Sequence, residues 1–179
     1  MKASTRNLTF SAMFLAIGLA LPFLTGQIPQ IGKMLCPMHS PVLLCGFICG
    51  WKYAAVVGFI CPLLRSVLFG MPTLYPSAIG MAFELMAYGL LVGVLSGKLG
   101  KDKIWKIYLA LVAAMLGGRL VWGLAQIVLL GVKGNRFTVS AFIAGGFVNA
   151  LPGIILQLIL IPALVFALEK RSVQRAVRE

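Results

Sequence analysis

The chain has 179 residues, of which 60% are hydrophobic and only 11% are charged, and its mean hydropathy is +1.00. A soluble domain of this length cannot bury so much apolar surface, so the composition excludes an ordinary soluble protein. The formal net charge of +12 would suggest nucleic-acid binding in a soluble fold. The basic residues instead gather at the ends of apolar segments, which is typical of a membrane protein, so we expect no nucleic-acid partner.

Apolar runs long enough to cross a hydrocarbon core of ~30 Å as helices recur along the chain. They predict an all-α integral membrane protein, a single bundle of six transmembrane helices formed by residues 1–179. The second segment is too short to cross alone, and we expect it to be tilted, half-inserted or continued by the loop before it. The six predicted spans are Leu8–Leu24, Ser40–Gly50, Ala54–Phe69, Ser77–Leu95, Ile107–Leu130 and Thr138–Leu168.

Three polar segments connect or follow these spans. Residues 25–39 form a long first loop that contains Pro and Gly, residues 98–106 form a strongly basic loop, and residues 169–179 form a basic tail. Outside the spans, eleven Lys and Arg residues lie on the side that carries both termini, and three lie on the other side. Positive residues accumulate in cytoplasmic loops, so we expect both termini in the cytoplasm and loop 25–39 outside.

Charged side chains within the apolar segments are the strongest functional signal. Arg65, Glu84 and Arg119 lie inside predicted spans, where a charge is costly and usually faces the bundle interior or a binding site. At 1.5 Å per residue these side chains fall in the outer half of the membrane or near its middle. Two interpretations remain open: the charges bind a polar ligand, or Glu84 forms a structural ion pair with one of the arginines.

Other polar and aromatic residues share helical faces with these charges. Spacings of three, four, seven or eight residues place side chains on one stripe of a helix. Arg119, Trp122 and Gln126 form one such stripe, Glu84 and Tyr88 a second, and Asn149 and Gln157 a third. The candidate substrate-binding residues are therefore Arg65, Glu84, Tyr88, Arg119, Trp122, Gln126, Asn149, His39 and Tyr75. We predict no catalytic residue and no metal site, and we interpret Cys36, Cys45, Cys49 and Cys61 as small buried residues.

Small residues recur at intervals of four and allow close helix packing. Ala12, Ala16 and Ala20 form one stripe on the first span, and we expect it to face either another helix of the bundle or another protein. The glycines of the second span, and those within and just after the fourth span, are better explained by packing inside the bundle. These are Gly46 with Gly50, and Gly89, Gly93 and Gly97.

These features together resemble a known family. A chain of this length with six spans, cytoplasmic termini, an A-x-x-x-A stripe and a long first outer loop is similar to the substrate-binding S component of energy-coupling factor (ECF) transporters. The resemblance covers essentially the whole chain and is closest to members predicted to carry a cobalamin lower-ligand precursor. It is strengthened by the stretches PMHSPVLLCGFICGWKY (37–53), PLLRSVLFGMPTLYP (62–76) and MAFELMAYG (81–89).

The resemblance implies a capture subunit in the bacterial cell membrane. Such a subunit binds a vitamin or cofactor precursor from outside and docks on a transmembrane coupling protein driven by two cytoplasmic ATPases. Ala12, Ala16 and Ala20 would form the docking face, and loop 25–39 would close over the substrate. The subunit itself would not be an enzyme and would bind no cofactor, because ATP hydrolysis would belong to its partners. The chain accordingly has no phosphate-binding G-x-x-x-x-G-K-[ST] motif. Membrane lipid would surround it.

The residues leave the substrate and two rival functions open. Dimethylbenzimidazole or its riboside is the expected cargo, with pyridoxine, pantothenate and queuine types as alternatives. Two arginines would favour a carboxylate, whereas Trp122, Tyr75 and Tyr88 would favour a planar ring. A stand-alone secondary transporter or channel is the main rival, although a single buried acid is a thin basis for ion coupling. A membrane enzyme would need clustered catalytic side chains, and His39 is the only histidine.

Overall fold

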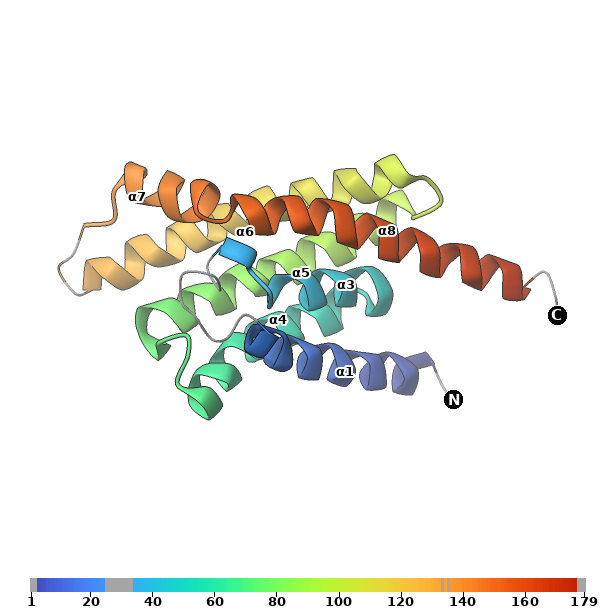
Figure 1. Ribbon diagram of the computed structural model, residues 1–179, viewed down its shortest axis with the longest axis horizontal. Coiled ribbons are helices and arrows are strands. Elements are labelled where there is room, and N and C mark those ends of the chain that lie inside the picture. The colour runs from blue at the N-terminus through green and yellow to red at the C-terminus, as the bar shows by residue number, and fades with distance from the viewer. Residues whose placement is uncertain (1–2, 25–33, 133, 135, 177–179) are drawn as a thin grey trace.

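The computed structural model describes residues 3–24, 34–132, 134 and 136–176, with side chains up to residue 168. The described chain forms five helices that are long and apolar enough to cross a membrane. They lie side by side along the long axis of the molecule (Figure 1). The prediction of an all-α membrane bundle is confirmed. The long helices are α1 (Ala3–Leu24), α4 (Trp51–Phe69), α5 (Ile79–Leu99), α6 (Ile104–Val132) and α8 (Leu151–Ala176).

The short second span is observed as helix α3 (His39–Cys49). Its 11 residues extend for about 16 Å, half of the hydrocarbon thickness. Cys36 and Met38, which precede the helix, are buried, so the chain reaches the interior before α3 begins. Non-helical backbone is tolerated at membrane depth when protein surrounds it, as here. The third span was expected to begin at Ala54, but Gly50 with φ 90° makes the turn after α3 and α4 already begins at Trp51.

The sixth predicted span is not one continuous helix. Thr138 caps the short helix α7 (Val139–Ile143), which continues as the wider turn η2 (Ala144–Val148), and α8 begins only at Leu151. Pro152 explains the interruption: it suits the first turn of α8, but its ring would clash with the carbonyl of Val148 if the helix were continuous.

The loops also differ in detail from the sequence prediction. Helix α4 ends at Gly70, which adopts φ 69° and donates its N–H to the Ser66 carbonyl. The following loop is shorter than expected, because the turn η1 (Leu74–Ala78) already leads into α5. The basic loop is likewise reduced to residues 100–103 between α5 and α6. Residues 25–33 of the predicted outer lid and the side chains of the tail 169–179 lie outside the described part.

Glycines allow α5 to approach its neighbours closely, as predicted. A Cβ on Gly93 would lie 2.4 Å from the Trp51 Cα, and one on Gly89 would lie 2.5 Å from the Ala54 carbonyl oxygen, both at the start of α4. On α3, a Cβ on Gly46 would meet a Val92 methyl at 2.2 Å. Gly97 differs from these, since a Cβ there would meet nothing within 4 Å.

The core consists of two apolar clusters, and α3 and α5 contribute to both. One cluster joins α3 and α5 to α6 and α8, and the other joins them to α1 and α4. Figure 1 shows the start of α1, the α5–α6 connection and the end of α8 at the same end of the bundle. All four cysteines are buried, in agreement with their interpretation as small packing residues.

Candidate functional site

A buried charged cluster lies where α3, α5 and α6 meet. Glu84 Oε1 on α5 lies 2.7 Å from Arg119 Nη1 on α6 and 3.4 Å from His39 Nε2 at the start of α3. The three residues are exposed by only 1%, 6% and 2% respectively. The structural ion pair considered from the sequence therefore exists, and its arginine is Arg119. Breaking a buried pair by removing one partner typically costs about 3–5 kcal/mol.

The close approach of α5 and α6 positions this cluster. Gly118 precedes Arg119, and a Cβ there would lie only 3.0 Å from the Tyr88 ring. The missing side chain lets the Tyr88 ring lie against α6, one helical turn from Glu84. The Tyr88 ring also meets the His39 ring edge-on, with centroids 5.3 Å apart.

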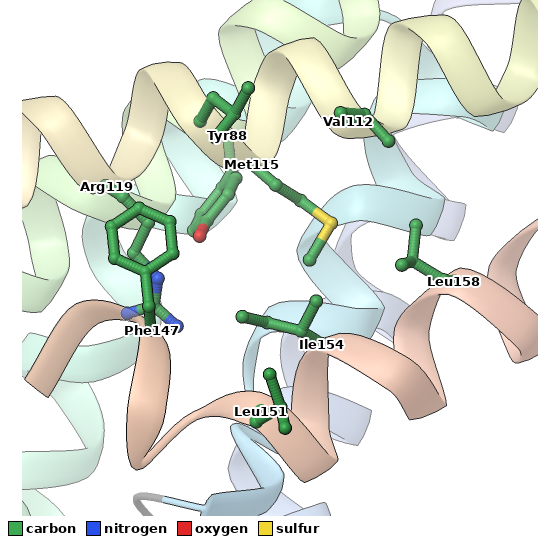
Figure 2. Close-up of a pocket in the computed structure, with 9 residues that line it drawn as sticks. Tyr88, Val112, Met115, Arg119, Phe147, Leu151, Ile154 and Leu158 are labelled. Carbon is green, nitrogen blue, oxygen red and sulfur yellow. The ribbon is translucent and has the colours of Figure 1, made fainter. Parts of the chain in front are cut away.

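A cavity of ≈ 250 Å³ adjoins the cluster between α5, α6, η2 and α8. In Figure 2 the Tyr88 hydroxyl and the Arg119 guanidinium lie at one end with the Phe147 ring, and Met115, Ile154 and Leu158 line the rest. The accessible wall of this cavity is apolar, and two residues that carry polar groups, Tyr88 and Arg119, lie at one end of it. Small-molecule pockets commonly combine a mostly apolar lining with a few polar groups. The lining residues are Tyr88, Val112, Met115, Leu116, Arg119, Phe147, Leu151, Ile154 and Leu158.

The segment before α3 closes the cluster from another side. Arg119 Nη2 donates to Cys36 Sγ at 3.7 Å, and Gln157 Nε2 on α8 donates to the Cys36 carbonyl at 3.5 Å. Cys36 adopts φ 47°, unusual for a residue other than glycine. A Cβ on Gly153 of α8 would lie 2.6 Å from the Met34 carbonyl oxygen, so the segment fits tightly against α8. Residues 34–39 therefore connect the loop to the charged cluster.

Arg65 lies apart from this cluster, contrary to the expectation that it joins the other candidate residues. Its Nη1 donates to the Leu19 carbonyl on α1 at 2.6 Å. Its guanidinium carbon lies 5.0 Å and 5.4 Å from the ring centroids of Phe23 and Phe69. The side chain is only 2% exposed, and these contacts stabilise it between the ends of α1 and α4.

The remaining candidates on α6 and η1 mostly make packing contacts. Trp122 is half-buried and stacks on Phe142 of α7 at 6.2 Å. Gln126 is buried against α5, where a Cβ on Gly80 would lie 2.8 Å from its Nε2. The Tyr75 hydroxyl donates to the Leu129 carbonyl. The three residues of the predicted stripe on α6 therefore have different neighbours. Arg119 lines the cavity, whereas Trp122 and Gln126 do not.

Asn149 and Gln157 do not share a helical face. Asn149 is exposed in the turn before α8, whereas Gln157 is 2% exposed within α8. The prediction assumed one continuous helix, and the break before Pro152 separates the two residues. Gln157 and Cys36 were not among the candidate site residues. A polar Gln157 inside an apolar span was a usable signal, but nothing in the sequence marks Cys36 or apolar lining residues such as Phe147.

The alanine stripe occupies the outer face of α1. Ala12, Ala16 and Ala20 are exposed, while Ser11 and Phe14 are buried toward the bundle. Gly18 also faces inward, since a Cβ there would lie 2.8 Å from Cys61 Sγ on α4. Of the two alternatives for the stripe, packing inside this bundle is excluded by its exposure. The face is open to lipid or to another protein.

The helices and the buried cluster define a multi-pass membrane protein with a small internal cavity. The family model described as ECF transporter, substrate-specific component matches residues 6–165, so the chain belongs to this family. It is thus a substrate-binding subunit of an ECF transporter, a transport component that associates with an ECF module. Searches of curated proteins and of solved structures gave no match.

Proposed function

We propose that this subunit captures a vitamin or cofactor precursor in the cavity between α5, α6, η2 and α8. The observation that carries the proposal is the placement of Arg119 and Tyr88 at one end of an otherwise apolar cavity. The other directly supporting feature is the Glu84–His39 contact, which ties α3 and the preceding segment to the same site. Of the candidate residues, Arg119 and Tyr88 line the cavity. Glu84 and His39 stabilise these two residues, because Glu84 pairs with Arg119 and His39 packs against the Tyr88 ring.

The proposed cargo is dimethylbenzimidazole or its riboside, followed by compounds of the pyridoxine, pantothenate or queuine type. Tyr88 and Phe147 line the cavity and supply aromatic surface for a planar ring. This aromatic lining favours flat ring compounds over extended chains as the cargo.

Uptake would require a coupling protein with two ATPases, located in the bacterial membrane with this subunit. The exposed face of Ala12, Ala16 and Ala20 is the proposed docking surface, because small side chains let a partner helix approach closely. Both termini would then be cytoplasmic and the cavity would open outward. The shared end of α1, the α5–α6 connection and α8 supports this orientation (Figure 1).

The first test is mass spectrometry of small molecules released from the subunit purified alone from rich medium. A stoichiometric vitamin-like ring compound is expected, since a capture subunit must retain dilute cargo. Leu158 lines the cavity and Ile159 is 66% exposed, so Leu158→Trp should lose the compound and Ile159→Trp should keep it. An empty wild-type protein, or equal retention by both variants, would contradict the assignment of this cavity.

The second candidate function is a stand-alone secondary transporter or channel for a small polar solute. It is favoured only by Glu84, the single buried acid among the side chains that the structure describes. Reconstitution distinguishes the two functions. Uptake into vesicles by the subunit alone would support independent transport, whereas uptake that requires coupling protein, ATPases and ATP would support the capture role.

A further inference from the structure

The charge balance of the site points to the chemistry of its ligand. We propose that the cavity accepts a compact, electrically neutral ring compound with one hydrogen-bond acceptor directed at Arg119, and that Glu84 sets this preference by cancelling the charge of Arg119. This inference rests on the proposal that the cavity is the substrate site, and it goes further by assigning the charge class of the substrate and a residue that determines it.

The first step is the compensation of Arg119. Arg119 is the one charged residue that lines the cavity in the described chain, and Glu84 lies 2.7 Å from its Nη1. Arg65, the other buried arginine of the described chain, is held by Leu19, Phe23 and Phe69 away from this site. An anionic ligand would therefore meet an arginine that is already neutralised, next to the carboxylate of Glu84. Burial of such an uncompensated negative charge in an apolar site is strongly unfavourable.

The second step is the hydrogen-bonding capacity that Arg119 keeps. Its Nε is buried and has no hydrogen-bond partner among the described residues. Buried donors are normally paired, and a site with an unpaired donor favours a ligand that supplies an acceptor. A ring nitrogen or carbonyl oxygen provides an acceptor without a formal charge. Tyr88 offers a second polar group at the same end of the cavity (Figure 2).

The third step is size. A cavity of ≈ 250 Å³ lies just below the range of about 300–1,000 Å³ that is usual for small-molecule sites. It suits one or two fused rings better than a ring that carries a sugar or a flexible acid chain. Among the proposed cargoes, size and charge together favour the free base over its riboside and disfavour a carboxylate of the pantothenate type.

The test compares two ligands that differ mainly in charge. The full-length subunit in lipid nanodiscs is titrated calorimetrically with 5,6-dimethylbenzimidazole and with benzimidazole-5-carboxylate. The titration is done at about pH 8, where the carboxylate ligand is ionised and the benzimidazole rings are uncharged. We expect the neutral compound to bind at least about tenfold more tightly.

A variant then tests the role of Glu84. Glu84→Gln leaves Arg119 uncompensated, so affinity for the carboxylate should rise at least about tenfold and the preference should shrink or reverse. Asp102→Asn is the matched control, because Asp102 lies in the α5–α6 loop and pairs with Lys106. Its ligand preference should equal that of the wild type. The wild-type comparison still decides the charge class if Glu84→Gln does not fold.

Each outcome decides the inference. Preference of the wild type for the neutral ligand, lost in Glu84→Gln, supports it. Equal or tighter binding of the carboxylate by the wild type overturns it, and so does an unchanged preference in a folded Glu84→Gln variant. If neither ligand binds, the inference also falls. The transport proposal is then judged separately by the released cargo and by dependence of uptake on the coupling protein.

Discussion

Arg65 of α4 donates a hydrogen bond to the Leu19 carbonyl of α1, with 2.6 Å between Nη1 and the oxygen. Arg65 therefore connects α4, which packs on α5, to α1, which carries the alanine face. This relationship assigns Arg65 a structural role and leaves Arg119 as the arginine of the cavity.

Replacement of Arg65 should reduce stability more than binding. Arg65→Leu leaves the Leu19 carbonyl without this donor, and we expect the free energy of unfolding to fall by about 1.5–3 kcal/mol. Arg65→Lys retains a charge but not the planar group that lies over Phe23 and Phe69, so an intermediate loss is expected. Thermal unfolding and retained cargo are measured on the same preparations. If an Arg65 variant lost its cargo while remaining as stable as the wild type, Arg65 would be assigned to the binding site instead.

Two glycines of one helix provide a matched test of packing. Gly93→Ala places a Cβ 2.4 Å from the Trp51 backbone and should destabilise the protein by about 1–3 kcal/mol. Gly97→Ala meets nothing within 4 Å and should be neutral or stabilising by up to about 1 kcal/mol. The four buried cysteines allow unfolding to be followed with a thiol-reactive dye. Equal unfolding temperatures for both variants would disprove the close contact between α4 and α5.

The alanine face of α1 should determine assembly. Ala16 is exposed, and Ala16→Trp adds a bulky ring where close helix approach is proposed. We expect co-purification of the coupling protein and ATPases to be lost while released cargo is retained. Leu124→Trp is the control, because Leu124 is 64% exposed on α6, far from α1 in sequence. If Ala16→Trp still assembles, the docking surface lies elsewhere.

The contact of Gly153 with the segment before α3 should control access to Cys36. Gly153→Ala introduces a Cβ 2.6 Å from the Met34 carbonyl, which must move and carry Cys36 with it. Cys36 is 7% exposed, so we expect its alkylation by N-ethylmaleimide to accelerate about tenfold or more once it becomes accessible. The rate is measured in a background with Cys45, Cys49 and Cys61 replaced by Ala. Gly131→Ala, with open space around its Cβ, should leave the rate unchanged.

Local pattern predicted the outline of the fold well. Membrane spans follow from composition and length, because a helix must satisfy its own backbone in lipid. The short second span was recognised from its length, and the close packing of Gly89 and Gly93 from their spacing. The break before Pro152 was not predicted. A proline within an apolar run is a local signal of such a break, but the long apolar segment was interpreted as one helix.

By itself, the sequence determined that this chain is a helical membrane protein with charges inside, because hydropathy and helix length depend only on neighbouring residues. The tertiary structure decided which charges meet. Gly58 of α4 packs against the Leu85 carbonyl next to Glu84, and Arg65 follows seven residues later, about 10 Å further along the helix. Gly118 instead places Arg119 at the level of Tyr88 and Glu84. Axial offset between packed helices is a long-range property, and no span considered alone reveals it.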